Sequence, residues 1–70
     1  MNKEEIRCEY KKMTRSELKK DKELLENGLN MVEIIPSYLV FRNRKIISLS
    51  EVTYRLAMIG LNYDSKIQGA

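Results

Sequence analysis

The 70-residue chain has no histidine, no tryptophan, a single cysteine and a single proline. One cysteine cannot form an internal disulfide, and a structural zinc site needs more cysteine and histidine ligands than this chain supplies. Catalysis that depends on a histidine base is excluded as well. The three glycines are isolated, so the chain has no glycine-rich phosphate-binding loop. These absences predict a non-enzymatic protein that uses no metal and no other cofactor.

Long apolar runs are absent too. The longest uncharged segments, residues 34–41 and 56–63, contain eight residues each, whereas a membrane-spanning helix needs about 20. The first eight residues, MNKEEIRC, have no apolar core of the signal-peptide kind. We therefore expect a cytoplasmic protein that has no contact with a membrane.

The chain reads as one small domain with a polar half and an apolar half. Residues 1–28 form a polar arm in which fifteen residues are charged, and residues 29–61 form an apolar core region with nineteen apolar residues. Residues 62–70 are polar and are expected to fray. A chain of this length has room for one domain only.

Two helices are predicted in the polar half. Residues 3–12 carry apolar side chains at helical spacing. Thr14 and Glu17 form a capping box that predicts a helix over residues 15–27, with Gly28 as a left-handed C-cap. Whether the two helices are continuous stays open, because the capping box favours a break while no glycine or proline interrupts the segment.

A β-hairpin is predicted next. Residues 38–41 and 46–47 are β-prone and flank Arg42-Asn-Arg-Lys45, in which Asn43 suits the tip. Residues 31–35 are a further strand or an irregular apolar link ending at Pro36. The predicted fold is α+β and mostly α, with N-terminal polar helices, a hairpin and a buried C-terminal helix. A small all-α bundle is the alternative.

The C-terminal helix is expected to span residues 49–59, between a Ser48 cap and a stop at Gly60. It is apolar around most of its circumference, and Glu51 and Arg55 mark its narrow polar face. Such a helix must be covered on more than one side. The polar N-terminal helices offer few apolar residues, so we expect a second copy of the chain to cover one side in a two-fold homodimer. The expected self-association residues are Phe41, Leu49, Val52, Leu56 and Ile59.

Two functions follow as hypotheses. The first is a small regulatory or adaptor protein that binds another protein, with helix 15–27 or the hairpin tip facing the target. The alternative is a small nucleic-acid-binding protein that uses basic side chains on phosphates. The net charge of +3 allows this alternative without demanding it. Its candidate residues are Arg42, Arg44, Lys45, Arg7, Lys11 and Arg15.

Overall fold

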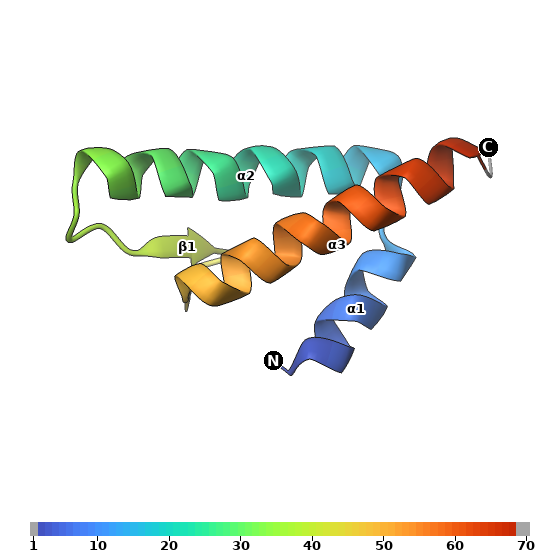
Figure 1. Cartoon of the computed structure of the whole chain (residues 1–70), viewed down its shortest axis with the longest axis horizontal. Helices are drawn as coiled ribbons and strands as arrows, with labels where there is room; N and C mark the ends of the chain where they lie inside the picture. Colours follow the sequence, from blue (N-terminus) through green and yellow to red (C-terminus); the bar gives the residue numbers. More distant parts are fainter. Residues whose placement is uncertain (1, 69–70) are drawn as a thin grey trace.

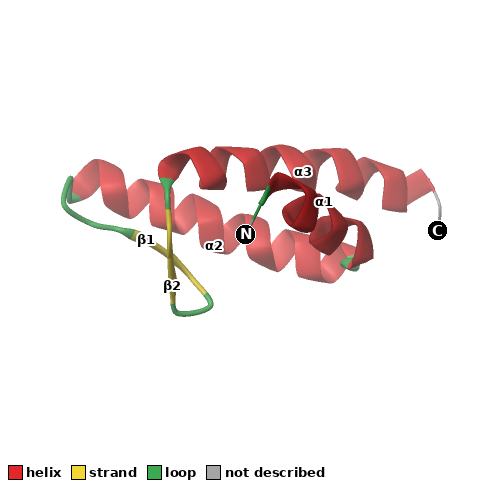
Figure 2. Cartoon of the chain, turned by 90° about the horizontal axis from the view of Figure 1, so that it is seen from below, coloured by secondary structure: helices red, strands yellow, loops and turns green. Residues whose placement is uncertain are grey.

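The computed structural model describes the backbone of residues 2–68 and the side chains of residues 2–64. Over this range the elements follow in the order α1 (Lys3–Lys12), α2 (Arg15–Ile34), β1 (Val40–Arg42), β2 (Lys45–Ile47) and α3 (Leu49–Gln68). The predicted mostly-α α+β fold is confirmed. In Figure 1, α3 lies between α2 and α1 and runs antiparallel to α2. Figure 2 shows the hairpin projecting from the helices.

The first two helices are separate, which settles the question that the sequence left open. Met13 has an extended backbone between them. The Thr14 hydroxyl accepts from the backbone N–H of Glu17 at 3.2 Å, and the Glu17 carboxylate accepts from the backbone N–H of Thr14 at 3.1 Å. This capping box starts α2 in a new direction, and α1 thereby packs against α3 with Ile6 and Tyr10 buried.

The prediction that the second helix ends at Gly28 is wrong, and so is the strand or irregular link expected before Pro36. Gly28 has no positive φ, and α2 continues through it to Ile34. A side chain at Gly28 would meet β1, because a Cβ there would lie 2.9 Å from Cγ1 of Val40. Gly28 thus permits close packing of α2 on the hairpin. The helix ends where Pro36 forces its neighbour Ile35 into an extended backbone.

The predicted hairpin is confirmed, with an antiparallel register that pairs Phe41 with Ile46. Its tip is a two-residue turn in which both Asn43 (φ 51°) and Arg44 (φ 65°) are left-handed, as in a type I′ turn. Only Asn43 was expected to adopt this conformation. The inner face of the hairpin is buried at Val40, while Phe41 and Ile46 are exposed.

The prediction that the C-terminal helix stops at Gly60 is wrong, because α3 continues to Gln68. Residues 62–68 thus belong to α3, whereas residues 69 and 70 lie outside the described residues, and the expected fraying of residues 62–70 stays a prediction. Tyr63 ties this extension to α2. The Arg15 guanidinium lies over its ring, 5.1 Å from the centroid, and donates to its hydroxyl at 3.3 Å.

The hydrophobic core lies where all these elements meet. Although α1 and α2 are rich in charge, each contributes apolar side chains that are completely or almost completely buried: Ile6 and Tyr10 from α1, and Leu18 and Leu25 from α2. Together with the hairpin, they bury Val52, Met58 and Ile59 of α3, whereas Thr53, Ala57 and Leu61 of the same helix are exposed. The buried apolar residues are Ile6, Tyr10, Leu18, Leu25, Val40, Ile47, Val52, Met58 and Ile59.

Candidate functional site

The five residues expected to form a self-association surface are separated in the structure. Val52 and Ile59 belong to the core of the chain itself, so neither is available to a second copy. The chain itself buries one side of α3, and the expectation that a second copy covers another side stays a prediction. Phe41 and Leu49 are exposed, and Leu56 is half-buried.

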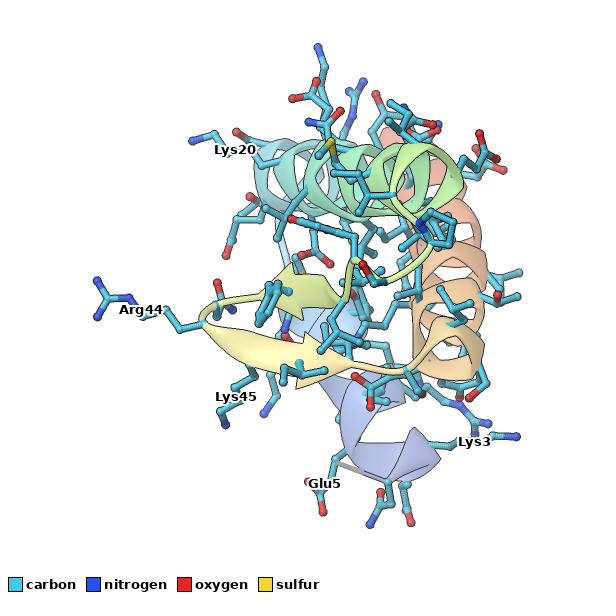
Figure 3. The ribbon with its side chains drawn as sticks, turned by 90° about the vertical axis from the view of Figure 1, so that its left-hand side faces the viewer. Lys3, Glu5, Lys20, Arg44 and Lys45 are labelled. Carbon is cyan, nitrogen blue, oxygen red and sulfur yellow. The ribbon has the colours of Figure 1, made fainter. Side chains whose placement is uncertain are left out.

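The six candidate phosphate-binding cations are also separated. Arg44 and Lys45 are exposed, and Figure 3 shows Arg44 pointing away from the body of the molecule. Arg15 is engaged with Tyr63. Arg7 and Lys11 are exposed on α1. The structure corrects the expectation for Arg42, whose side chain is only 11% exposed and faces inward rather than toward a ligand.

Arg42 belongs to a buried ionic cluster, which we define as Glu9, Tyr10, Asp21, Arg42, Glu51 and Arg55. Its Nε donates to Oδ1 of Asp21 at 2.7 Å, and its Nη2 donates to Glu9. The Tyr10 hydroxyl donates to the other oxygen of Asp21. The cluster therefore links β1 with α1 and α2.

Arg55 closes the ionic cluster from α3. Its Nη1 lies 3.2 Å from Oε2 of Glu9 and 3.3 Å from the Tyr10 hydroxyl. Its Nε donates to Oε2 of Glu51 at 3.2 Å. Both arginines also lie within 6 Å of the Tyr10 ring centroid, at 5.9 Å for Arg42 and 5.7 Å for Arg55. Every helix thus contributes to one polar network.

The ionic cluster shifts the pKa of its members in directions that keep the ion pairs charged. Burial raises the pKa of Glu9, but the hydrogen bonds and charges of Arg42 and Arg55 outweigh it, so the net pKa is lowered. Burial and the hydrogen bond to Asp21 raise the pKa of Tyr10 to about 12. For both arginines, burial opposes the charged form, yet their partners raise the pKa.

Sequence reasoning found only part of this cluster. The Glu51–Arg55 pair is confirmed at 3.2 Å, but its expected place on a polar outer face is wrong because Arg55 is buried. Asp21 interrupts the apolar stripe that Leu18 and Leu25 form along the buried face of α2. A lone carboxylate in such a stripe signals a buried ion pair, although it does not identify the partner. The carboxylates of Glu9, Asp21 and Glu51 all form ion pairs with Arg42 or Arg55, so we assign the ionic cluster a structural role.

A second feature is a set of exposed apolar side chains at one end of the molecule. They come from the end of α2, the following loop, the hairpin and the start of α3, which meet on the left of Figure 1. Phe41 and Ile46 are paired across the hairpin, and the Tyr38 ring packs edge-on against Phe41 with centroids 6.2 Å apart. We define the apolar end as Ile34, Ile35, Leu39, Phe41, Ile46 and Leu49.

A third feature is a groove of about 540 Å³ between α2 and α3, which we name the α2–α3 groove. Apolar side chains of α3 form its floor, and charged side chains line its sides. Its lining residues are Lys19, Lys22, Glu26, Leu56, Ile59, Gly60, Tyr63 and Asp64.

Among the described residues, no group of three metal-binding side chains comes together. The helices that the structure describes are each too short or too polar to cross a bilayer. Comparison with known proteins finds no matching family model, no similar curated protein and no similar solved structure. The apolar end and the α2–α3 groove are the two candidate interaction surfaces of the described residues.

Proposed function

We propose that this chain is a small, non-enzymatic adaptor or regulatory protein of the cytoplasm, which binds another protein and associates with a second copy of itself. The apolar end carries the proposal. Its six large apolar side chains are exposed although the chain has a complete core of its own. Soluble monomers rarely gather so much apolar surface in one place without a partner.

The energetics favour a reversible dimer. Covering the exposed half of a large apolar side chain is worth about 1 kcal/mol. The six residues of the apolar end on each of the two copies are together worth about 12 kcal/mol. This exceeds the association cost of about 4–15 kcal/mol over most of its range, by at most about 8 kcal/mol. A two-fold arrangement brings the same surface of each copy together. The expected dissociation constant is about micromolar or weaker.

In this proposal, α2 contacts the protein partner. This helix has charges of both signs along its exposed surface, and mixed charge favours selection and steering of a protein partner. Nucleic acid is a less favoured target, because Arg42 is bound to Asp21 and Glu9. Arg44 and Lys45 remain at the hairpin tip for that alternative.

Light scattering after size exclusion, over a dilution series, tests the proposal. Phe41→Ser and Ile46→Ser should shift the chain toward the monomer at every concentration. Leu24→Ser and Leu61→Ser are matched controls outside the apolar end. Their exposed fractions, 42% and 67%, are close to the 44% of Phe41 and the 63% of Ile46. The controls should leave the dimer unchanged.

A monomeric parent at about millimolar concentration would contradict self-association, as would equal disruption by the two controls. Binding to duplex DNA or RNA at about 50 mM salt, lost with the Arg44→Ala and Lys45→Ala variant, would instead favour the nucleic-acid alternative.

A further inference from the structure

The α2–α3 groove has an open floor at Gly60. Glycine is the poorest helix former after proline, so a glycine within a helix calls for a reason. At Gly28 the reason is the close approach of Val40. At Gly60, apart from its chain neighbours and the adjacent backbone of its own helix, no described atom lies within 4 Å of the position of a Cβ, and its φ is not positive. Contacts within the described chain therefore give no reason for the glycine, and the open space faces the groove.

The groove is cationic at the end where Tyr63 lies. Lys19 and Lys22 line it from α2, and Arg15 covers the Tyr63 ring beside them. Among the side chains of residues 2–64, Lys19 and Lys22 have no ion-pair partner. The charges of Arg15, Lys19 and Lys22 all reach Tyr63, and the acidic lining residues are Asp64 beside it and Glu26.

The other end of the groove is less basic. Glu26 follows Lys19 by seven residues, which is about two helical turns or 10 Å. Leu56 and Ile59 lie between the two walls and supply the apolar floor. The groove thus has an apolar base and positive charge near Tyr63. A complementary ligand is apolar along the side that contacts the base and acidic at the end that lies near Tyr63.

The Tyr63 hydroxyl lies within reach of these positive charges. Hydrogen bonding from Arg15 and the nearby charges of Arg15, Lys19 and Lys22 lower the pKa of its phenol. The Arg15 guanidinium donates to the hydroxyl oxygen, so the hydroxyl proton can be donated to an acidic group that enters the groove.

We propose that the α2–α3 groove binds a short amphipathic helix of a partner protein, with apolar residues on the Leu56, Ile59 and Gly60 floor and acidic residues toward Lys19 and Lys22. This inference rests on the proposed adaptor function and names its target class. The lining residues of α3 span about 12 Å, which corresponds to about two turns of the bound helix. Gly60 lets that helix approach α3 closely, and the lysines select acidic over basic segments.

Fluorescence anisotropy with designed peptides tests the groove. The probe is a labelled amphipathic peptide of about 14 residues with leucines on one face and glutamates beside them. Its partner probe replaces every glutamate with lysine. The glutamate peptide should bind at least about ten-fold more tightly at about 50 mM salt, and the difference should shrink as salt screens the charges.

Variants of the chain locate the binding site. Gly60→Leu fills the open floor and should weaken the glutamate peptide at least about ten-fold. Lys19→Glu should weaken it by a similar factor and does not depend on how Gly60→Leu folds. Lys20→Glu is the matched control, because it makes the same charge change at the next residue, which is exposed and is not among the lining residues of the groove.

The inference is overturned if the glutamate peptide does not bind at about millimolar concentration. Equal affinity for both peptides overturns it as well, and so does a Lys20→Glu variant that loses as much affinity as Lys19→Glu. Failure here is distinguishable from failure of the adaptor function. If Phe41→Ser disrupts the dimer while no peptide binds, self-association stands and the groove assignment falls.

Discussion

The two glycines within helices predict opposite effects for the same substitution. Both Gly28 and Gly60 lie inside α-helices with right-handed backbones. At either position, alanine improves helix propensity by about 1 kcal/mol. The two positions differ only in what the added methyl group meets, so the pair of variants measures the packing of α2 on β1.

Gly28→Ala should destabilise the protein. Its new Cβ would lie 2.9 Å from Cγ1 of Val40, closer than carbon atoms tolerate, and Val40 is buried and branched at Cβ. Forcing an extra methyl group into a filled core costs about 1–3 kcal/mol. The propensity gain offsets part of this, which leaves a net loss of about 1 kcal/mol. Gly60→Ala meets nothing within 4 Å and should gain about 1 kcal/mol.

Urea denaturation followed by circular dichroism measures both free energies of unfolding. A difference of about 2 kcal/mol between the variants is expected, which corresponds to about 8–16 °C in Tm for a domain of this size. A double-mutant cycle with Val40→Ala isolates the cause. Gly28→Ala should become neutral or stabilising once Val40 is shortened. If Gly28→Ala is as stable as Gly60→Ala in the parent, the close packing of α2 on β1 is refuted.

The ionic cluster and the hairpin turn give four further predictions. Arg42→Ala leaves Asp21 buried at 7% exposure without its cation, and we expect a loss of about 3 kcal/mol in chemical denaturation; a loss under about 0.5 kcal/mol would contradict the buried pair. Arg44→Gly relieves a left-handed backbone at φ 65° and should raise the free energy of unfolding by about 1 kcal/mol; no gain would argue against the type I′ turn. The raised pKa of Tyr10 favours its neutral form in the folded state, so stability is full below the ordinary pKa of 10 and falls as pH rises toward the folded value of about 12. In a measurement of the free energy of unfolding against pH, Tyr10→Phe should remove this alkaline loss of stability. The lowered pKa of Glu9 predicts a separate loss of stability as the pH falls below its ordinary value of 4.5.

The sequence predicted the helix starts and the hairpin better than the helix ends. The capping box of Thr14 and Glu17 is a local device, because its atoms are three residues apart, and it appears in the structure as expected. By comparison, a glycine in the sequence does not show whether a helix ends there. It ends a helix only when its backbone turns left-handed, and at Gly28 the approach of a strand twelve residues away explains it instead. That approach has no local signature.

The sequence underestimated how much of α3 its own chain buries, because the count of apolar residues in α1 and α2 said little about their placement. Tyr10, Leu18 and Leu25 are few, but each is fully buried. The ionic cluster was missed for a related reason. Arg42 and Asp21 are separated by 21 residues, and only the three-dimensional fold brings the arginine of a hairpin under a helix. From the sequence alone, an arginine near a hairpin tip that binds a ligand cannot be distinguished from one that forms a buried ion pair.

Self-association through the apolar end is the central claim, and amide NMR spectra over a dilution series test it most directly. A labelled sample is diluted from about 1 mM to about 10 µM, a range that crosses the expected dissociation constant. The account predicts that resonances of residues 34–49 shift or broaden together with concentration, and that Ile46→Ser abolishes the change. Spectra that do not change with concentration, or changes centred on the α2–α3 groove, would contradict it.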